Sequence, residues 1–522
     1  RDDVESRGLG DVYKRQIFFR LGKEKNRLGE EMKSREKEIV DIILFSLITG
    51  LVTVFCAICL MESHDGDFNW YCVLGKAIVN GKPNFHGVDA YSWIAQERGG
   101  SEIQHSWLGT VIAYGFSVLF QPIMNAVIAF VFATSTLCAV VFRLTFLKNW
   151  NGNAFSKLLA HCVVIWIVVD SCYLARTRAF DCMLFALAYH CLQQDKPSKK
   201  KIFILGIISL LWANLHGSSM LFYFAILAVF AVMNLIPDFH VGNLFHRQSK
   251  ENARTDFIAL GVSILIGMIN PYGIKLYGYA LFHNVSYTKD GVHEWYKALF
   301  LFYPIVICLI LFFIFFVLQK KNISLKKIFP IVMMLGMTGI HIRMYMYMEI
   351  AMIPMLLEVI KTMDSTLFVK CKMFSKNALV MIVCGCCSGL LFAETIKEYQ
   401  SCKYEEVSTG LIEYLKEKNF QRAYNDYDLG AYLIYNGLPD FVDTRADFYD
   451  EETLSGANYF RDASFDKQGD IEKFMDTFQF DAIILNQKSA VTIDYLLSND
   501  WQIDYADKES EGQRKYVVLI QK

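Results

Sequence analysis

Long apolar blocks recur along most of this chain, and they constrain its fold more than any other feature. Most of them run for roughly 15–25 residues, the length that spans the hydrocarbon core of a bilayer. Hydrophobic residues make up 54% of the 522 residues and charged residues only 20%, and the apolar excess is concentrated in these blocks. The sequence therefore predicts a mainly α-helical, polytopic membrane protein.

The basic residues between the blocks predict which side each block starts from. Lys33, Arg35 and Lys37 precede the first block, so the positive-inside rule places the N-terminus in the cytoplasm. The other basic linkers alternate consistently if the short block 107–120 does not cross the bilayer. That arrangement gives about eleven crossings, while twelve or thirteen stay open because several blocks are short. The blocks are residues 41–61, 107–120, 123–141, 155–175, 179–192, 202–215, 218–236, 257–269, 298–318, 328–340, 344–360 and 378–393.

The chain divides into a membrane part and a polar C-terminal part. Residues 1–38 are predicted to be a cytoplasmic tail, of which 1–16 fit neither a signal peptide nor a span and are interpreted as a cloning or assembly scar. Residues 39–396 form the transmembrane domain, whose first outer loop is 62–106. Residues 403–522 mix helical and strand patterns, including a helix at Val407–Lys418 and strands at 480–485 and 515–520. They predict a small extracytoplasmic α/β domain.

Two acids follow the first span, Asp65 and Asp67, in a loop that is too polar to cross a bilayer. Apolar residues from Phe68 to Ile78 recur at helical spacing, which predicts a short helix on the membrane surface with the two acids at its start. A carboxylate at the mouth of a membrane cavity can act as a general base. The alternative is a solvated loop acid or a helix cap.

Further polar residues gather on the same predicted outer face. Arginine suits phosphate because its guanidinium binds two oxygens at once, and membrane-interface snorkelling is the alternative. The amide, imidazole and turn residues could line a substrate cavity, or could be satisfied helix ends. The phosphate candidates are Arg176, Arg178 and Arg343, and the cavity candidates are Asn214, His216, Tyr272, His293 and Glu294.

Several functions are not supported by the composition. The net charge is −1 and no basic face is long enough to indicate nucleic acid. Of the 14 cysteines most lie in apolar blocks, including the run Cys384–Cys387, where thiols act as small apolar side chains. No metal site is predicted.

The order of these motifs resembles the GT-C superfamily of membrane glycosyltransferases. The resemblance is closest to the protein O-mannosyltransferase and aminoarabinose-transferase-like branch, where an acid follows the first span and an H-P-P-L-G-like segment opens the second. Here the segment reads HSWLG (105–109), with Ser106 and Trp107 in place of the prolines. WANLHG (212–217), NPYG (270–273), HEW (293–295) and the segment 427–450 look like an uncharacterised bacterial branch.

The resemblance implies a hexosyl- or pentosyltransferase in the plasma membrane that takes a sugar from a polyprenyl-phosphate-linked donor. The acceptor, a lipid, glycan or protein, is not predicted, and a divalent metal stays open because metal dependence varies across the superfamily. By the resemblance Asp67 is the first choice as base and Asp65 the second. Glu102 and His105 fall where the family places residues near the donor phosphate.

Two other classes of function stay open. A lipid or solute transporter or flippase would need ionisable residues at mid-membrane and inverted symmetry, and no repeat is evident. A non-catalytic scaffold would use its outer domain to bind a partner, for which the segment Asp443–Tyr449 has the charge and aromatics. That segment is equally a candidate for a salt-bridged turn.

Overall fold

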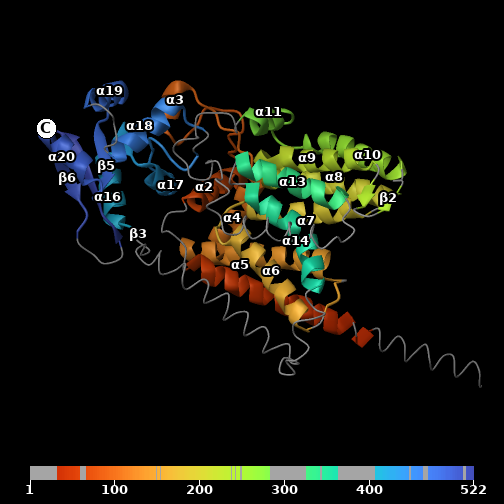
Figure 1. The fold of residues 1–522 in the computed structure, drawn as a ribbon. Coiled ribbons are helices and arrows are strands. Elements are labelled where there is room, and N and C mark those ends of the chain that lie inside the picture. Colours follow the sequence, from red (N-terminus) through yellow and green to blue (C-terminus); the bar gives the residue numbers. More distant parts are fainter. Residues whose placement is uncertain are drawn as a thin grey trace, which may run out of the picture.

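The computed structural model consists of a body of packed helices and a smaller α/β domain, with the first outer loop between them (Figure 1). The residues it describes are 32–33, 35–58, 66–148, 150–152, 154–194, 196–236, 238–240, 243–246, 250–282, 325–340, 344–362, 406–445, 448–462, 468–508 and 513–522.

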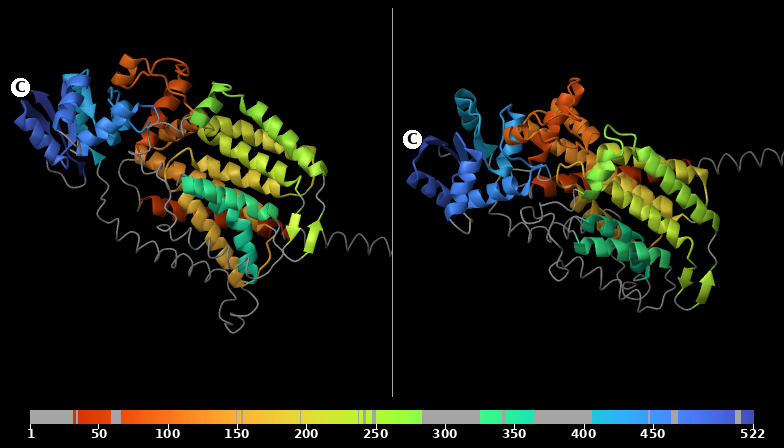
Figure 2. Two further views of the ribbon diagram at one scale, coloured as in Figure 1. Left: turned by 45° about the horizontal axis from the view of Figure 1, so that its top comes forward. Right: turned by 90° about the horizontal axis from the view of Figure 1, so that it is seen from above.

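The helical body follows the apolar blocks of the sequence. Its core is one continuous cluster of buried side chains contributed by nearly all of its helices. Figure 2 shows the helices of the middle of the chain lying side by side in this body. They are α4 (Trp107–Leu119), α5 (Ile123–Phe142), the π-helix η1 (Arg143–Leu147), α6 (Ala154–Cys172), α7 (Ala179–Gln193), α8 (Lys199–Leu215), the 3-10 turn η2 (Gly217–Ser219), α9 (Met220–Met233), α10 (Lys250–Gly267), α11 (Lys275–Phe282), α13 (Leu325–Ile340) and α14 (Tyr345–Thr362), with the hairpin β1 (Asp238–His240) and β2 (Asn243–His246) before α10.

Within the described ranges, two helices are long and apolar enough to cross a membrane, Arg35–Ile58 and the continuous stretch Ile123–Leu147. Among the described residues, α4 and the segments Gly217–Met233 and Ile328–Thr338 are apolar but shorter. The helical class is as predicted from the sequence. The count of about eleven to thirteen spans stays a prediction, and two predicted blocks, 298–318 and 378–393, lie outside the described residues.

The first outer loop contains two helices, α2 (Asp67–Val79) and α3 (Trp93–Arg98). α2 covers the predicted surface helix, and it buries Phe68 and Trp70 between α4 and the C-terminal domain. α3 begins at Ser92, whose hydroxyl accepts the N–H of Ala95, as an N-cap residue commonly does. It ends where Gly99 adopts a positive φ of 68°.

The C-terminal domain is built on a four-stranded sheet in the order β4-β5-β8-β6. β4 and β5 are parallel, while β8 pairs antiparallel with β5 and β6. The predicted strands at 480–485 and 515–520 are β5 and β8, both apolar and largely buried. The elements are β3 (Glu406–Val407), α16 (Thr409–Lys418), β4 (Ala423–Asn425), α17 (Tyr427–Tyr435), α18 (Glu451–Asp462), α19 (Gln468–Phe478), β5 (Ala482–Asn486), α20 (Ala490–Ser498), β6 (Trp501–Ala506), β7 (Gln513–Arg514) and β8 (Tyr516–Gln521).

Part of the first outer loop belongs to the core of this domain. Trp93 and Ile94 of α3 pack with the buried aromatic cluster of the domain, and the Trp93 ring stacks on Phe441 at a centroid distance of 5.3 Å. The indole N–H of Trp93 donates to the carbonyl of Ala423, 3.0 Å away. The loop therefore connects the helical body to the domain by packing as well as by sequence.

Candidate functional site

The predicted base, Asp67, forms an ion pair with one of the predicted phosphate ligands. Its Oδ2 lies 3.1 Å from Nε of Arg176, which follows α6. The side chain of Asp67 is 19% exposed and that of Arg176 is 26% exposed, so solvent can still reach both. Asp67 also opens α2, where a carboxylate is stabilised by the helix dipole.

The C-terminal domain lies directly against this pair. A Cβ placed on Gly66 would come within 3.0 Å of Ala431 and 3.1 Å of Thr444. The charges of Asp67 and Arg176 both act on the phenol of Tyr427, the first residue of α17. Burial raises the pKa of Tyr427 well above its usual value, and Asp67 raises it further, so the phenol stays protonated and donates to the carbonyl of Thr444 at 2.9 Å.

Close backbone contact at Gly109 brings three predicted motifs together. A Cβ on this glycine would lie 2.6 Å from a side-chain carbon of Thr177 and 2.9 Å from the carbonyl oxygen of Leu215. A side chain at position 109 would therefore fit only if one of these neighbouring segments moved. The HSWLG segment thus meets the RTR and WANLHG segments at this glycine.

Two predicted histidines lie next to each other at this junction. The rings of His105 and His216 have centroids 5.4 Å apart, and the backbone N–H of Gly217 donates to the carbonyl of His105 at 2.7 Å. His105 also stacks on Tyr279, whose hydroxyl lies 3.2 Å from its Nδ1.

A buried carboxylate that was not predicted as a site residue orients His216. The Oδ2 atom of Asp181 accepts hydrogen bonds from Nδ1 of His216 at 2.6 Å, from Ser219 at 2.7 Å and from Tyr347 at 2.9 Å. A histidine held in this way at Nδ1 presents Nε2 for proton transfer or for binding an anion. An acid inside the apolar run of α7 is the sequence signal that could have identified Asp181.

Replacing Asp181 with asparagine should lower the free energy of unfolding by about 1–3 kcal/mol, because an amide oxygen cannot satisfy the three donors as a carboxylate does. Tyr347→Phe is the matched control: it removes one of the three bonds and should cost about 1 kcal/mol. Thermal unfolding of both variants in detergent measures the difference. Equal stability of the two would contradict a role for Asp181 in holding the cluster.

Other predicted residues have structural partners. Asn214 accepts the indole N–H of Trp107 at 2.8 Å and donates to the carbonyl of Ile269 at 2.9 Å. The hydroxyl of Tyr272 accepts the backbone N–H of Gln104 at 2.9 Å. These contacts join the ends of α4, α8 and α10, so both residues hold the junction together.

Arg178 acts on a different group of acids from Arg176. The positive charge of Arg178 interacts electrostatically with Asp170 of α6 and with Glu349 of α14, which both lie inside the helical body. The four remaining predicted residues, Asp65, Arg343, His293 and Glu294, lie outside the described residues.

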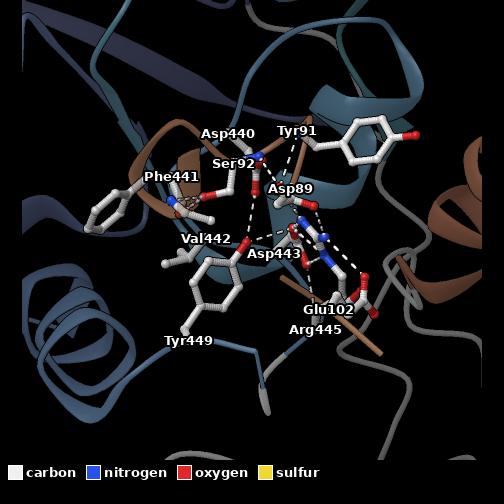
Figure 3. A network of polar contacts seen from close by, with 12 residues as sticks. Asp89, Tyr91, Ser92, Glu102, Asp440, Phe441, Val442, Asp443, Arg445 and Tyr449 are labelled. Atoms are coloured by element: carbon white, nitrogen blue, oxygen red, sulfur yellow. Dashed lines mark hydrogen bonds and ion pairs between the residues drawn. The ribbon is translucent and has the colours of Figure 1, made fainter. Parts of the chain in front are cut away.

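Glu102 belongs to a buried charge network that joins the first outer loop to the C-terminal domain (Figure 3). Arg445 is at its centre. Its Nη1 lies 2.6 Å from Asp89 and 3.2 Å from Glu102, and its Nη2 lies 2.5 Å from Asp443. The guanidinium also lies over the ring of Trp70 at 4.1 Å. Asp443 and Arg445, at the start of the segment Asp443–Tyr449, are thus joined by a salt bridge.

The pKa values of two carboxyl groups in this network are shifted in opposite directions. Burial acts to raise the pKa of Asp443, but the charge and hydrogen bonds of Arg445 hold it below its usual value. Asp440 is buried without such a partner, and burial and the charge of Asp443 raise its pKa well above the usual range. Tyr449 donates to Asp443 at 2.7 Å. Asp440 therefore carries the proton of the pair.

Replacing Asp440 with asparagine should make the domain more stable at pH 8 relative to the wild type. A carboxyl whose folded-state pKa is raised contributes stability below its ordinary pKa and loses it as pH rises through the raised value. The wild type should therefore lose stability between pH 5 and pH 8, and Asp440→Asn should lose less. Thermal unfolding at both pH values tests this, with the exposed Asp476→Asn as control. An unchanged pH dependence in Asp440→Asn would contradict it.

Metal ligation finds no support in the part of the chain that the structure describes. No group of three or more histidine, cysteine, aspartate or glutamate side chains there could hold a metal ion. The chemistry available is a carboxylate, an arginine and an oriented histidine pair.

Comparison with known proteins shows a likeness to a solved structure. No protein-family model and no curated protein matches the chain. The chain is similar to the crystal structure of an oligosaccharyltransferase from Archaeoglobus fulgidus tethered with an acceptor peptide. The identity is 8%, the match covers 90% of this chain and 74% of that chain, and the TM-score is 0.41. A TM-score of 0.41 is too low for the likeness to support a functional conclusion, so the function of this chain is inferred from its own geometry.

Proposed function

We propose that the chain is a membrane glycosyltransferase that moves a sugar, a hexose or a pentose, from a polyprenyl-phosphate-linked donor to an acceptor on the extracytoplasmic side. The observation that carries the proposal is the solvent-accessible ion pair of Asp67 and Arg176, whose chain segment meets the segments of His105 and His216 at Gly109. It puts a base and cationic or hydrogen-bonding groups for a phosphate at one junction.

The two members of the pair have separate roles. The donor phosphate competes with Asp67 for the guanidinium of Arg176, and its binding leaves the carboxylate available to the acceptor. The acceptor hydroxyl then attacks the anomeric carbon while its proton passes to Asp67. The bond between that carbon and the phosphate oxygen breaks, and polyprenyl phosphate leaves with the electron pair. Arg176 stabilises the charge that develops on the phosphate.

The histidines support the same step. His105 and His216 lie next to each other, and their segments meet the segment of Arg176 at Gly109. Because His216 donates its Nδ1–H to Asp181, its Nε2 can donate a hydrogen bond to a phosphate oxygen only when the ring is doubly protonated.

The direct test is release of polyprenyl phosphate from a panel of polyprenyl-phosphate sugars by the full-length protein in proteoliposomes. Sugar-dependent release with at least one donor is expected. If no donor supports release and the protein instead moves a lipid or solute in response to an ion gradient, the transporter alternative replaces the enzyme. If neither activity appears, the scaffold alternative remains.

Replacing Arg176 with glutamine should raise the donor KM about 10-fold to 100-fold, because a charge-assisted hydrogen bond contributes about 1.5–3 kcal/mol. Turnover at saturating donor should fall less. Arg254→Gln, on the exposed side of α10, is the matched control and should leave both constants unchanged. A donor KM that does not change in Arg176→Gln would remove Arg176 from the phosphate site.

A further inference from the structure

A cavity lies between α2, α4 and the end of α17, and nothing in the proposed chemistry uses it. Its volume is about 760 Å³, within the range of small-molecule sites. Four separate parts of the chain form its walls. They are Cys72, Val73 and Lys76 of α2, Tyr114, Ser117, Val118 and Gln121 at and after α4, Ala90 and Tyr91, and Ile434, Tyr435 and Gly437–Pro439.

The lining of this cavity mixes apolar and polar side chains and carries a single charge. Lys76 is the one charged side chain among the lining residues, none of which is acidic. Its ammonium forms no ion pair with any residue that the structure describes, and it is exposed. Tyr91, Tyr114 and Tyr435 add phenol groups, and tyrosine is enriched where a protein meets the interface of a bilayer. The cavity therefore favours a ligand with one negative charge and an apolar part.

The edge of the cavity continues into an exposed apolar surface. Val118, which lines it, keeps 58% of its area exposed, and the next two residues, Leu119 and Phe120, keep 75% and 43%. Contiguous apolar residues at a surface indicate contact with lipid or with a partner. α4 is itself one of the short apolar helices, which favours lipid.

The cavity is separate from the Asp67 pair. Asp67 and Lys76 are nine positions apart on α2, which places them on opposite sides of the helix and roughly 14 Å apart along its axis. A ligand at Lys76 is therefore screened from Arg176 by the body of α2.

We propose that this cavity binds an anionic phospholipid of the surrounding bilayer, with its phosphate at Lys76 and its acyl chain along Val118–Phe120. The proposal rests on the membrane location in the proposed function, but not on transferase activity. Because α17 and the turn after it form one wall, the bound lipid would attach the C-terminal domain to the membrane surface.

The test is photo-crosslinking of the full-length protein in detergent with a photoactivatable phosphatidylglycerol, followed by mass spectrometry of the labelled peptides. Labelling within α2, α4 or residues 434–439 is expected. Lys76→Met should reduce it about fivefold, the effect of one lysine near an anionic lipid surface. Lys82→Met, an exposed lysine in the turn after α2 that does not line the cavity, should not.

A second variant keeps the test independent of charge. Val118→Trp should block the entrance and abolish labelling without lowering the unfolding temperature, because Val118 is exposed. Equal labelling by a photoactivatable phosphatidylcholine, or labelling unchanged by Lys76→Met, would overturn the proposal. Displacement of the probe by polyprenyl phosphate at a concentration below that of the probe would also overturn the proposal, because the cavity would then be part of the donor site. A protein that is labelled as expected but transfers no sugar would contradict the proposed function alone.

Discussion

Replacing Asp67 with asparagine is expected to lower the turnover of sugar transfer by about 10²–10⁴-fold, the usual contribution of a general base. Asparagine has nearly the same shape and still accepts hydrogen bonds, but it cannot take a proton from the acceptor. The donor KM should change little or fall, because Arg176 would lose the carboxylate that competes with the donor phosphate. A loss confined to turnover would distinguish the role of Asp67 as the base from the role of Arg176 as the phosphate ligand.

The controls for this variant follow from its position. Asparagine is an acceptable residue at the start of a helix, so the loss of charge at α2 should cost only about 0.3–1 kcal/mol of stability. Asp494→Asn, exposed on α20, controls for the loss of an outer carboxylate. Turnover within twofold of the wild type in both Asp67→Asn and Asp65→Asn would remove the proposed mechanism.

Replacing Arg445 with methionine should lower the free energy of unfolding of the C-terminal domain by about 3–5 kcal/mol. The guanidinium keeps only 4% of its side-chain area exposed, and its loss leaves the carboxylates of Asp89 and Asp443 buried and uncompensated. Burial acts to lower the pKa of Arg445, but the negative charges around it and the hydrogen bond to Asp443 raise that pKa well above its ordinary value, so the guanidinium is charged at every accessible pH. Limited proteolysis within residues 86–100 and thermal unfolding both measure the effect.

Two comparisons make this prediction specific. Arg461→Met removes an ion pair with Asp462 that is largely exposed and should cost at most about 1 kcal/mol. Adding Asp89→Asn and Asp443→Asn to Arg445→Met should recover part of the lost stability, because neutral amides cost less to bury than charges. A triple variant less stable than Arg445→Met would show that the network acts through packing on Trp70 and not through charge.

The sequence predicted the elements well where their pattern was regular and local. The apolar blocks from Ile123 onward match α5–α10 to within a few residues, except at α10, which begins seven residues before its apolar block. The strands at 480–485 and 515–520 follow from continuous apolar runs. The helix at the start of the first outer loop was predicted from the spacing of Phe68, Trp70 and their neighbours.

The contacts between distant segments could not be predicted in the same way. Asp89 and Arg445 are 356 residues apart, and no local pattern indicates that one loop supplies the counterion of the other. Trp93 lies within the predicted first outer loop, yet it packs in the core of the C-terminal domain. Such pairings are set by the tertiary fold.

The position of Trp93 has a consequence for biogenesis. At about 5–20 residues per second, the ribosome needs roughly 20–70 s to add the residues that separate the first outer loop from its partners in the domain. During that interval the indole of Trp93 and the carboxylate of Asp89 lack the groups that surround them in the finished protein. The nascent loop would therefore expose these groups until translation of the C-terminal sheet is complete.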